Sequence, residues 1–268
     1  MDYFRFFIYG LIQGITEFIP ISSTGHLKII SLLFGIEDPG SSLSAIFQLG
    51  SVLALLWYFR SDFNFLDIFR NKLTYENSYT KSVLKSVFIA TLSIVFLGFL
   101  IKTFYPGYTN SFLRSNLSIG IVSILMAILM LLADNTRRVY NSLKNHSLIS
   151  SFLIGLGQAL SIIPGVSTSG ITISTAFLLG WKKEDAARFS FIIGIPSISI
   201  AALVELLDFN ANDLLLIIGP LIIGLLTTFV ISILSIDFCI RFVSLKGLRI
   251  FAYYRLLFGT LIILTNFK

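Results

Sequence analysis

Long apolar stretches separated by short polar gaps are the feature of this sequence that most restricts its fold. Of the 268 residues, 55% are hydrophobic and only 13% are charged, and the mean hydropathy is +0.87. Several stretches approach the roughly 20 residues that a helix needs to cross the hydrocarbon core of a membrane, and so low a charge is untypical of soluble domains. We therefore predict an all-α, polytopic membrane protein that forms a single membrane domain over residues 1–268.

The net charge of +6 does not indicate a nucleic-acid-binding protein, because the basic residues lie in the short gaps between apolar stretches. Cytoplasmic loops of membrane proteins collect such residues, so we expect no nucleic-acid partner. The single cysteine, Cys239, cannot form an internal disulfide, and no Cys/His cluster offers a zinc site. His146 lies in a polar connection, where we expect a solvated side chain.

A proline breaks two of the apolar stretches into pairs of short helices. The expected pairs are 3–19 with 26–35, around Pro20, and 148–163 with 170–180, around Pro164. Each of these helices is too short to span the hydrocarbon, so each pair is expected to form a re-entrant hairpin. The expected full spans are 43–59, 86–104, 117–133, 189–206, 214–236 and 248–266, with a short interfacial helix inside the polar segment 60–85.

The two hairpins belong to a weak internal repeat. The run from Gly10 to Gln13 returns from Gly155 to Gln158, and the run that begins at Pro20 returns in altered form at Pro164. We predict a first repeat over 1–146 and a second over 147–268, each with one re-entrant hairpin and three transmembrane helices. Three spans are an odd number, so the second repeat must have inverted topology in the bilayer.

This topology distributes Lys and Arg unevenly. One side receives four of them, Arg5, Lys102, Arg114 and Lys268. The other receives fourteen: Arg60, Arg70, Lys72, Lys81, Lys85, Arg137, Arg138, Lys144, Lys182, Lys183, Arg188, Arg241, Lys246 and Arg249. Because basic residues mark the cytoplasmic side, we predict a multi-pass cell-membrane protein with both termini outside.

A run of polar residues, QGITEFIPISSTGH from Gln13 to His26, crosses the first hairpin. Ionisable groups at membrane depth are expensive unless paired, so they indicate a functional site. Gln13 and Glu17 are four residues apart and share one helix face, directed toward the turn that carries Ser23 and His26. A carboxylate, an imidazole and hydroxyls can supply a base, a nucleophile and a metal ligand. Since the run contains no Lys or Arg, we expect a divalent cation beside Glu17.

A related run, QALSIIPGVSTSGIT from Gln158 to Thr172, crosses the second hairpin. Ser167, Thr168, Ser169 and Gly170 open a helix there, where free N–H groups and hydroxyls suit a phosphate. We expect the two turns to meet near the membrane midplane, so that one binds the anion while the other attacks or protonates it. The alternative role for small hydroxyl residues is helix packing, which applies to Ser22, Thr24, Ser161, Thr168 and Ser174. For Gln158 we favour an interhelical hydrogen bond.

Both runs resemble signatures of the undecaprenyl-diphosphate phosphatases, the bacitracin-resistance type of polyprenyl diphosphate phosphatase. Gln13 and Glu17 followed by Pro20-Ile-Ser-Ser-Thr-Gly-His26 are similar to the first signature, and Pro164-Gly-Val-Ser-Thr-Ser-Gly-Ile-Thr172 to the second. The segments Gln48 to Ser51, Phe189 to Phe191 and Tyr254-Arg255 also resemble the family. The resemblance therefore covers essentially the whole chain.

The resemblance implies a membrane hydrolase that removes the terminal phosphate from an undecaprenyl-type diphosphate and so recycles the carrier lipid for cell-envelope glycan synthesis. It also implies a Mg²⁺ or Ca²⁺ ion and an active site open to the outer face, and it allows a homodimer. By position, Glu17 holds the metal or acts as base, with Gln13 beside it, and either Ser23 or His26 is the nucleophile. The residues implied to bind the diphosphate are Ser167, Ser169 and Thr172, with Thr168 and Gly170 in the same turn.

The second signature carries one departure, since the family has an arginine where Thr168 stands. Either another cation takes that role or the enzyme is slow. Arg255 is the best substitute, because it lies in the otherwise apolar span 248–266 and an unpaired arginine there needs an anion. Alternatively, Arg255 pairs with an acidic residue or reaches the headgroups.

Two other functions fit parts of the pattern. Inverted repeats with broken helices are typical of transporters, so a lipid-phosphate flippase is one alternative. An inactive homologue that only binds polyprenyl phosphate is the other, and the missing arginine is its sole argument.

Overall fold

The computed structural model describes residues 3–35, 39–62, 78–105, 112–136, 139–209 and 211–265. Its α-helices are α1 (Tyr3–Thr16), α2 (Ser23–Phe34), α3 (Gly40–Tyr58), α5 (Ser78–Phe104), α6 (Asn116–Asp134), α7 (Leu148–Ala159), α8 (Thr168–Leu178), α9 (Lys183–Asp208), α10 (Ala211–Lys246) and α11 (Arg249–Thr265). Each of the ten predicted hairpin and spanning helices is present. The interfacial helix predicted within 60–85 falls mostly outside the described residues.

Three helices, α5, α9 and α10, are clearly longer than predicted, and α10 exceeds its prediction the most. α10 spans 36 residues, whereas the sequence predicts a span over 214–236 only. It continues to Lys246 and ends where Gly247 adopts a φ of 71°, with the Gly247 N–H bonded to the Val243 carbonyl at 2.9 Å. A glycine in this left-handed conformation is a common helix terminator. α10 therefore continues for several turns beyond residue 236, until the chain reaches Gly247.

The distribution of side chains is that of a membrane protein. Within the described part of the chain, four helices are long and apolar enough to cross a bilayer, over Thr80–Phe104, Asn116–Asp134, Lys183–Leu207 and Leu214–Lys246. Large apolar side chains such as Phe99 and Leu216 are exposed on the outside, whereas polar ones such as Gln13 and Thr228 are buried. An apolar exterior around a partly polar interior suits lipid and not water. The chain is therefore a multi-pass membrane protein.

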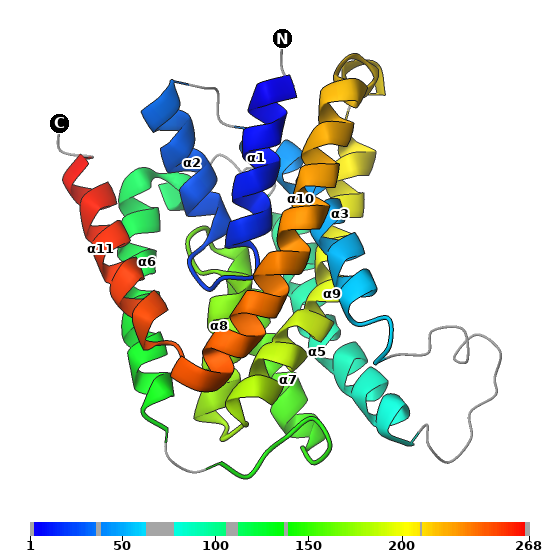
Figure 1. Ribbon diagram of the computed structural model, residues 1–268, viewed down its shortest axis with the longest axis vertical. Coiled ribbons are helices and arrows are strands. Elements are labelled where there is room, and N and C mark those ends of the chain that lie inside the picture. The colour runs from blue at the N-terminus through cyan, green and yellow to red at the C-terminus, as the bar shows by residue number, and fades with distance from the viewer. Residues whose placement is uncertain are drawn as a thin grey trace.

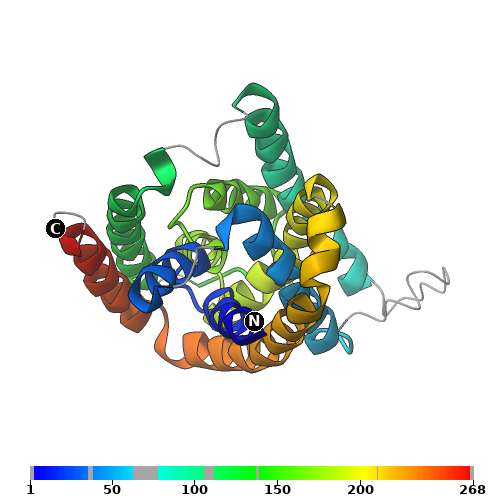
Figure 2. The same cartoon turned by 90° about the horizontal axis from the view of Figure 1, so that it is seen from above.

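Two helical hairpins approach each other from opposite ends of the molecule. The hairpin of α1 and α2 enters from the end that carries both termini, and that of α7 and α8 enters from the other end (Figure 1). Their turns meet about halfway, where the Ser169 hydroxyl donates to the Glu17 carbonyl at 3.2 Å. Seen from above, α1 and α2 lie inside the rim formed by α10, α11 and α6 (Figure 2). The fold therefore places both polar turns in the interior.

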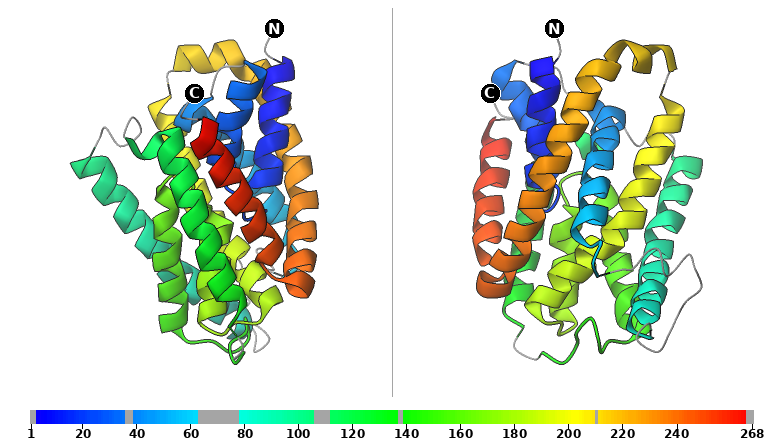
Figure 3. Two further views of the ribbon diagram at one scale, coloured as in Figure 1. Left: turned by 90° about the vertical axis from the view of Figure 1, so that its left-hand side faces the viewer. Right: turned by 45° about the vertical axis from the view of Figure 1, so that its right-hand side comes forward.

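Close helix contacts depend on glycine. A Cβ at Gly120 of α6 would lie 2.9 Å from the Gly259 carbonyl oxygen of α11, and a Cβ at Gly259 would lie 2.6 Å from the Gly120 oxygen. Small residues let membrane helices approach in this way. On the opposite side of the molecule α3 lies between α10 and α9 (Figure 3), against both of which it packs.

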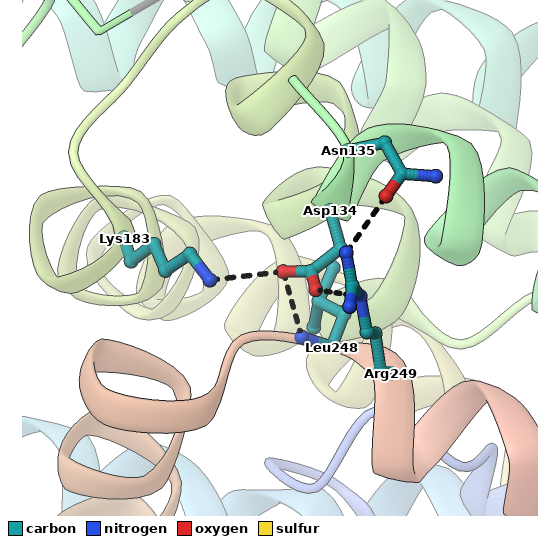
Figure 4. Close-up of polar contacts among 5 residues, drawn as sticks. All are labelled: Asp134, Asn135, Lys183, Leu248 and Arg249. Atoms are coloured by element: carbon teal, nitrogen blue, oxygen red, sulfur yellow. Dashed lines mark hydrogen bonds and ion pairs between the residues drawn. The ribbon is translucent and has the colours of Figure 1, made fainter. Parts of the chain in front are cut away.

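A buried carboxylate ties three helices together at the end opposite the termini (Figure 4). Asp134, at the end of α6, accepts hydrogen bonds from Lys183 Nζ at 3.1 Å and from the Leu248 N–H at 3.2 Å. Arg249 Nε lies 3.0 Å from its second oxygen. These contacts fix the start of α11 against α6 and α9, and α11 carries Tyr254 and Arg255 to the two turns.

Candidate active site

The two hairpin turns enclose a cleft of about 80 Å³. Both hairpins and α3 contribute to its wall, which consists mostly of hydroxyl, amide and carboxylate side chains: Thr16, Glu17, Ser22, Ser23, Thr24, Gln48, Ser161, Ile163, Gly165, Ser167 and Thr168. Glu17, Ser23, Ser167 and Thr168 are among the site residues predicted from the sequence. The structure brings these four residues together, although Glu17 and Thr168 are 151 positions apart in the sequence.

Each hairpin turn ends in a serine with an unusual backbone conformation. Ser22 has a φ of 77° and Ser167 a φ of 70°, and among the described residues no other non-glycine residue has a positive φ. Such conformations cost about 1–3 kcal/mol each and are commonly found at functional sites. Each serine directly precedes a helix, α2 or α8, whose first-turn N–H groups have no partner within the helix. Two helix N-termini therefore converge on one cleft and favour an anion there.

Glu17 lies at the junction of the two turns, and its side chain is buried. Its Oε2 accepts hydrogen bonds from Gln13 Nε2 at 2.7 Å and from Ser23 Oγ at 3.2 Å. Its backbone oxygen accepts the bond from Ser169 Oγ. The carboxylate is thus held in contact with a cleft hydroxyl, and the second hairpin holds its main chain.

The oxygen atoms near Glu17 suit a hard cation. Gln13 Oε1 is buried without a hydrogen-bond partner, so an acceptor oxygen lies next to the carboxylate and lacks a donor. Among the described residues no group of three His, Cys, Asp or Glu side chains could hold a metal ion by itself. Mg²⁺ commonly binds through one or two carboxylates together with substrate phosphates and water. The donor set around Glu17 fits that pattern and not a closed protein cage.

His26 does not belong to the wall of the cleft. Because the Ser22 carbonyl can only accept, His26 Nδ1 carries the proton in their 2.7 Å hydrogen bond. In the neutral ring Nε2 then accepts from the Tyr254 hydroxyl, also at 2.7 Å. The imidazole stacks on Phe258 with a ring separation of 4.2 Å. Both ring nitrogens are engaged, and the residue supports the carbonyl of Ser22.

The remaining residues predicted in the second hairpin build its helix start. Ser167 Oγ accepts a hydrogen bond from the Gly170 N–H at 3.3 Å. Thr172 Oγ1 donates to the Thr168 carbonyl at 2.7 Å and also contacts Ser190 of α9. Gly170 and Thr172 are absent from the cleft wall, so the structure places them behind the site.

Arg255 is buried beneath both turns. Its Nη1 lies 3.5 Å from the Pro20 oxygen and 3.3 Å from the Val166 oxygen, and Nη2 bonds to the Gly165 oxygen. Nε donates to the Ser123 carbonyl at 3.4 Å. The guanidinium therefore binds backbone carbonyls of both hairpins and does not line the cleft. Arg255 is fully buried and, within the described residues, its hydrogen bonds go to these carbonyls and not to the acidic residue or the lipid headgroups that the sequence suggested as alternatives.

Comparison with known proteins agrees with this arrangement. Residues 6–261 match the family described as bacitracin resistance protein BacA. The chain belongs to this family. It is 54% identical over 266 residues to the undecaprenyl-diphosphatase of Prochlorococcus marinus strain MIT 9215, covering 98% of this chain and 99% of that protein. It is 42% identical over 264 residues to the undecaprenyl-diphosphatase of Synechococcus sp. strain RCC307, covering 97% and 92%. The family membership predicted from the two motifs is confirmed.

Sequence reasoning missed some contributors to this BacA-family site. Gln48 of α3 and Thr16 line the cleft, and so does Ser161, for which packing was the alternative. Gln48 belongs to a segment that resembles the family, and Thr16 and Ser161 lie in the two polar runs. No local pattern shows that these side chains face the cleft, because the opposing hairpin turn is distant in the sequence. For Gln158 the favoured interhelical bond is confirmed, since its Nε2 donates to Ser197 Oγ of α9 at 2.8 Å.

The prediction for His146 was wrong. His146 Nε2 lies 2.8 Å from Ser86 Oγ of α5, and the ring packs against Trp181 and Phe189. The side chain is half-buried and not solvated. Its aromatic neighbours lie more than 30 positions away, so the polar residues next to it in the sequence gave a misleading indication.

Proposed function

We propose that this chain is an undecaprenyl-diphosphatase, which converts undecaprenyl diphosphate to the monophosphate and inorganic phosphate and so recycles the lipid carrier of cell-envelope glycan synthesis. One observation carries the proposal: two helix N-termini and one buried carboxylate converge on a single polar cleft inside a membrane fold. The helix N-termini match the negative diphosphate, and the carboxylate can accept a proton from a nucleophile. The names of its relatives support the same reaction.

The geometry favours Ser23 as the nucleophile and Glu17 as its base. Ser23 Oγ already donates to Glu17 Oε2, so Glu17 takes the proton as the oxygen attacks the terminal phosphorus. The new bond joins Ser23 Oγ to that phosphorus, while the bond from phosphorus to the bridging oxygen breaks, and polyprenyl monophosphate leaves with the proton that Glu17 had taken. Water then attacks the phosphoserine and gives a proton to Glu17, the P–Oγ bond breaks, Glu17 returns the proton to Ser23 Oγ, and inorganic phosphate is released. His26 positions Ser22 in this scheme.

A divalent cation, Mg²⁺ or Ca²⁺, completes the proposed site. Glu17 and the unpaired Gln13 Oε1 would hold it together with diphosphate oxygens. When bound, it neutralises charge on the transferring phosphoryl group. This contribution matters here because no Lys or Arg among the described residues lines the cleft.

The proposal includes two inverted repeats, 1–146 and 147–268. The matching positive φ of Ser22 and Ser167, each directly before the second helix of its hairpin, supports it. The helix ends and connections opposite the termini carry most of the described basic residues: Arg60, Lys81, Lys85, Lys144, Lys182, Lys183, Arg188, Arg241, Lys246 and Arg249 (Figure 1). We assign that end to the cytoplasm, with the termini outside and the cleft open to the outer face.

Phosphate release by the purified protein in liposomes tests this function against its alternatives. A diphosphatase releases inorganic phosphate from undecaprenyl diphosphate in a cation-dependent reaction. A flippase would move the lipid between leaflets without releasing phosphate, and a binding homologue would do neither. Either of these last two results would overturn the proposal.

A further inference from the structure

Gln48 of α3 differs from the other residues in the wall of the cleft. Among the described residues it is the only member of that wall that lies outside the two hairpins. Its side chain is half-buried, and within the described part of the chain its amide makes no hydrogen bond. An amide in the interior of a membrane fold needs hydrogen-bond partners. Its donor and its acceptor are therefore available to whatever occupies the cleft.

The packing of α3 directs Gln48 toward the two turns. Gly50 lies so close to α10 that an added Cβ would be 2.7 Å from the Leu225 carbonyl oxygen, so α3 has little freedom to rotate. Leu55, seven residues after Gln48 and therefore on the same face of the helix, borders a small space together with Glu17. The face of α3 that carries Gln48 thus packs against the first hairpin turn.

The small size of the cleft limits what can separate Gln48 from the reacting atoms. Gln48, Glu17 and Ser23 all line the same space of about 80 Å³. A phosphoryl group that reacts with Ser23 in so small a space either contacts Gln48 or is separated from it by a bound water. Gln48 is therefore placed to act on the reaction directly.

We propose that Gln48 orients the water that hydrolyses the phosphoserine. The inference rests on the proposed function and assigns a residue to its second step. In-line displacement brings this water to the side of phosphorus opposite Ser23 Oγ, so the group that holds it must come from elsewhere in the wall. An amide can accept a hydrogen bond from the water through Oε1 and donate one to a phosphoryl oxygen through Nε2.

Glu17 remains the base of this step, because a neutral amide does not take a proton. Its Oε2 is bonded to Gln13 and Ser23, whereas no described residue donates to its Oε1. The water oxygen bonds to phosphorus and one of its protons passes to Glu17. The P–Oγ bond then breaks, and Glu17 returns the proton to Ser23 Oγ. Gln48 stays neutral throughout and holds the second O–H of the water.

Gln48→Met tests the assignment, because methionine keeps the length of the side chain and loses both hydrogen bonds. The substrate is undecaprenyl diphosphate labelled in its terminal phosphate. We expect one equivalent of undecaprenyl monophosphate per enzyme at the wild-type rate, phosphate release at least tenfold slower, and label trapped on Ser23. Steady-state kcat should fall while kcat/KM is retained, because the monophosphate leaves before the water attacks. Ser23→Ala in the same variant should abolish the trapped label.

Gln158→Met is the matched control. Gln158 bonds to Ser197 of α9 and does not line the cleft, so this variant should lower the unfolding temperature without trapping phosphate. Gln48→Asn keeps an amide on a shorter stem and should show the Gln48→Met pattern with a smaller effect. If Gln48→Met does not fold, Gln48→Asn decides by the same criteria.

Three results for Gln48→Met would overturn the inference and leave the proposed function standing. They are an unchanged kcat, an equal slowing of both products, and a lower kcat/KM without trapped phosphate, which would show that Gln48 binds the phosphate groups instead. Phosphate trapped in Gln158→Met would overturn it as well. A wild type that releases no phosphate would contradict the proposed function itself.

Discussion

At the scale of single residues, hydrogen bonds distinguish the two candidate nucleophiles. Ser23 lines the cleft and donates to Glu17, whereas both nitrogens of His26 are engaged with Ser22 and Tyr254. A nucleophile needs a base within hydrogen-bond reach and access to the reacting atom. Ser23 has both, and His26 supports the turn that presents it.

Ser23→Ala should therefore lower kcat at least 100-fold, which corresponds to about 2.7 kcal/mol of transition-state stabilisation. His26→Phe keeps the aromatic stack on Phe258 and loses both hydrogen bonds. It should lower the thermal unfolding temperature and reduce kcat less than Ser23→Ala does. Steady-state phosphate release and mass spectrometry of enzyme denatured at near-neutral pH, which preserves both phosphoserine and phosphohistidine, measure these effects. Phosphate trapped on His26, or full turnover by Ser23→Ala, would contradict the assignment.

Thr168 and Arg255 have different expected roles. Thr168 lines the cleft at the position where the family signature has an arginine. Thr168→Arg therefore adds a guanidinium that can donate two parallel hydrogen bonds to one phosphate. We expect it to raise kcat/KM for undecaprenyl diphosphate severalfold. Unchanged or lower kcat/KM would mean that the helix N-termini and the cation already balance the charge.

Arg255→Ala should act through stability. Its loss leaves the Pro20, Gly165 and Val166 carbonyls buried without this donor, and each such group costs about 1–3 kcal/mol. We expect a lower unfolding temperature, together with a loss of kcat as the two turns separate. Arg255→Lys, with fewer donors, should be intermediate. An Arg255→Ala protein of native stability that had lost only phosphate affinity would show instead that Arg255 binds the anion.

At the scale of helices and connections, the sequence was informative where the signal is local. Pro20 and Pro164 correctly marked the two hairpins, and the apolar stretches marked the remaining helices. The partners of Arg255 could not be predicted, because they are backbone carbonyls of turns about 90 and 235 positions away. The position of Gln48 in the cleft wall likewise depends on how α3 packs against the hairpins, and the hydrophobic periodicity of the sequence does not predict that packing.

His146, in the connection between α6 and α7, provides a pH-dependent contact. Burial lowers the pKa of His146 below its ordinary value of 6.5. The folded protein therefore favours the neutral ring, and the unfolded chain binds the proton more readily as the pH falls through 6.5. The unfolding temperature should fall with acidification below that pH. The decline should be smaller in His146→Phe, measured by thermal unfolding in detergent between pH 7.5 and 5. Parallel curves for the two proteins would contradict this account.

At the scale of the whole molecule, the proposed topology makes Tyr140 and Glu184 lie on one side of the membrane. The Tyr140 N–H bonds to the Gly180 carbonyl and the Lys182 N–H to the Asn141 carbonyl, both at 3.0 Å, so the two connections flanking the second hairpin are adjacent. Both side chains are exposed. Leu207 is exposed at the opposite end of α9.

Single cysteines in a Cys239→Ser background test this topology by labelling intact cells with a membrane-impermeant maleimide. We expect Leu207→Cys to react from outside, and Tyr140→Cys and Glu184→Cys to react only after the membrane is permeabilised. The predicted topology also places Asp38 and Asn210 outside and Asn71 inside, but these three positions lie outside the described residues. Labelling of only one of Tyr140→Cys and Glu184→Cys from outside would refute the re-entrant second hairpin.

The most direct test of the central claim measures phosphate release from undecaprenyl diphosphate by the purified protein and its Glu17→Gln variant, with Mg²⁺ or Ca²⁺ and with excess chelator. The substitution keeps the size of the side chain and removes both the base and the negative charge that would hold a cation. We expect cation-dependent release by the wild type, at least a 100-fold loss in Glu17→Gln and weaker cation binding by that variant. Full turnover by Glu17→Gln in excess chelator would contradict the account.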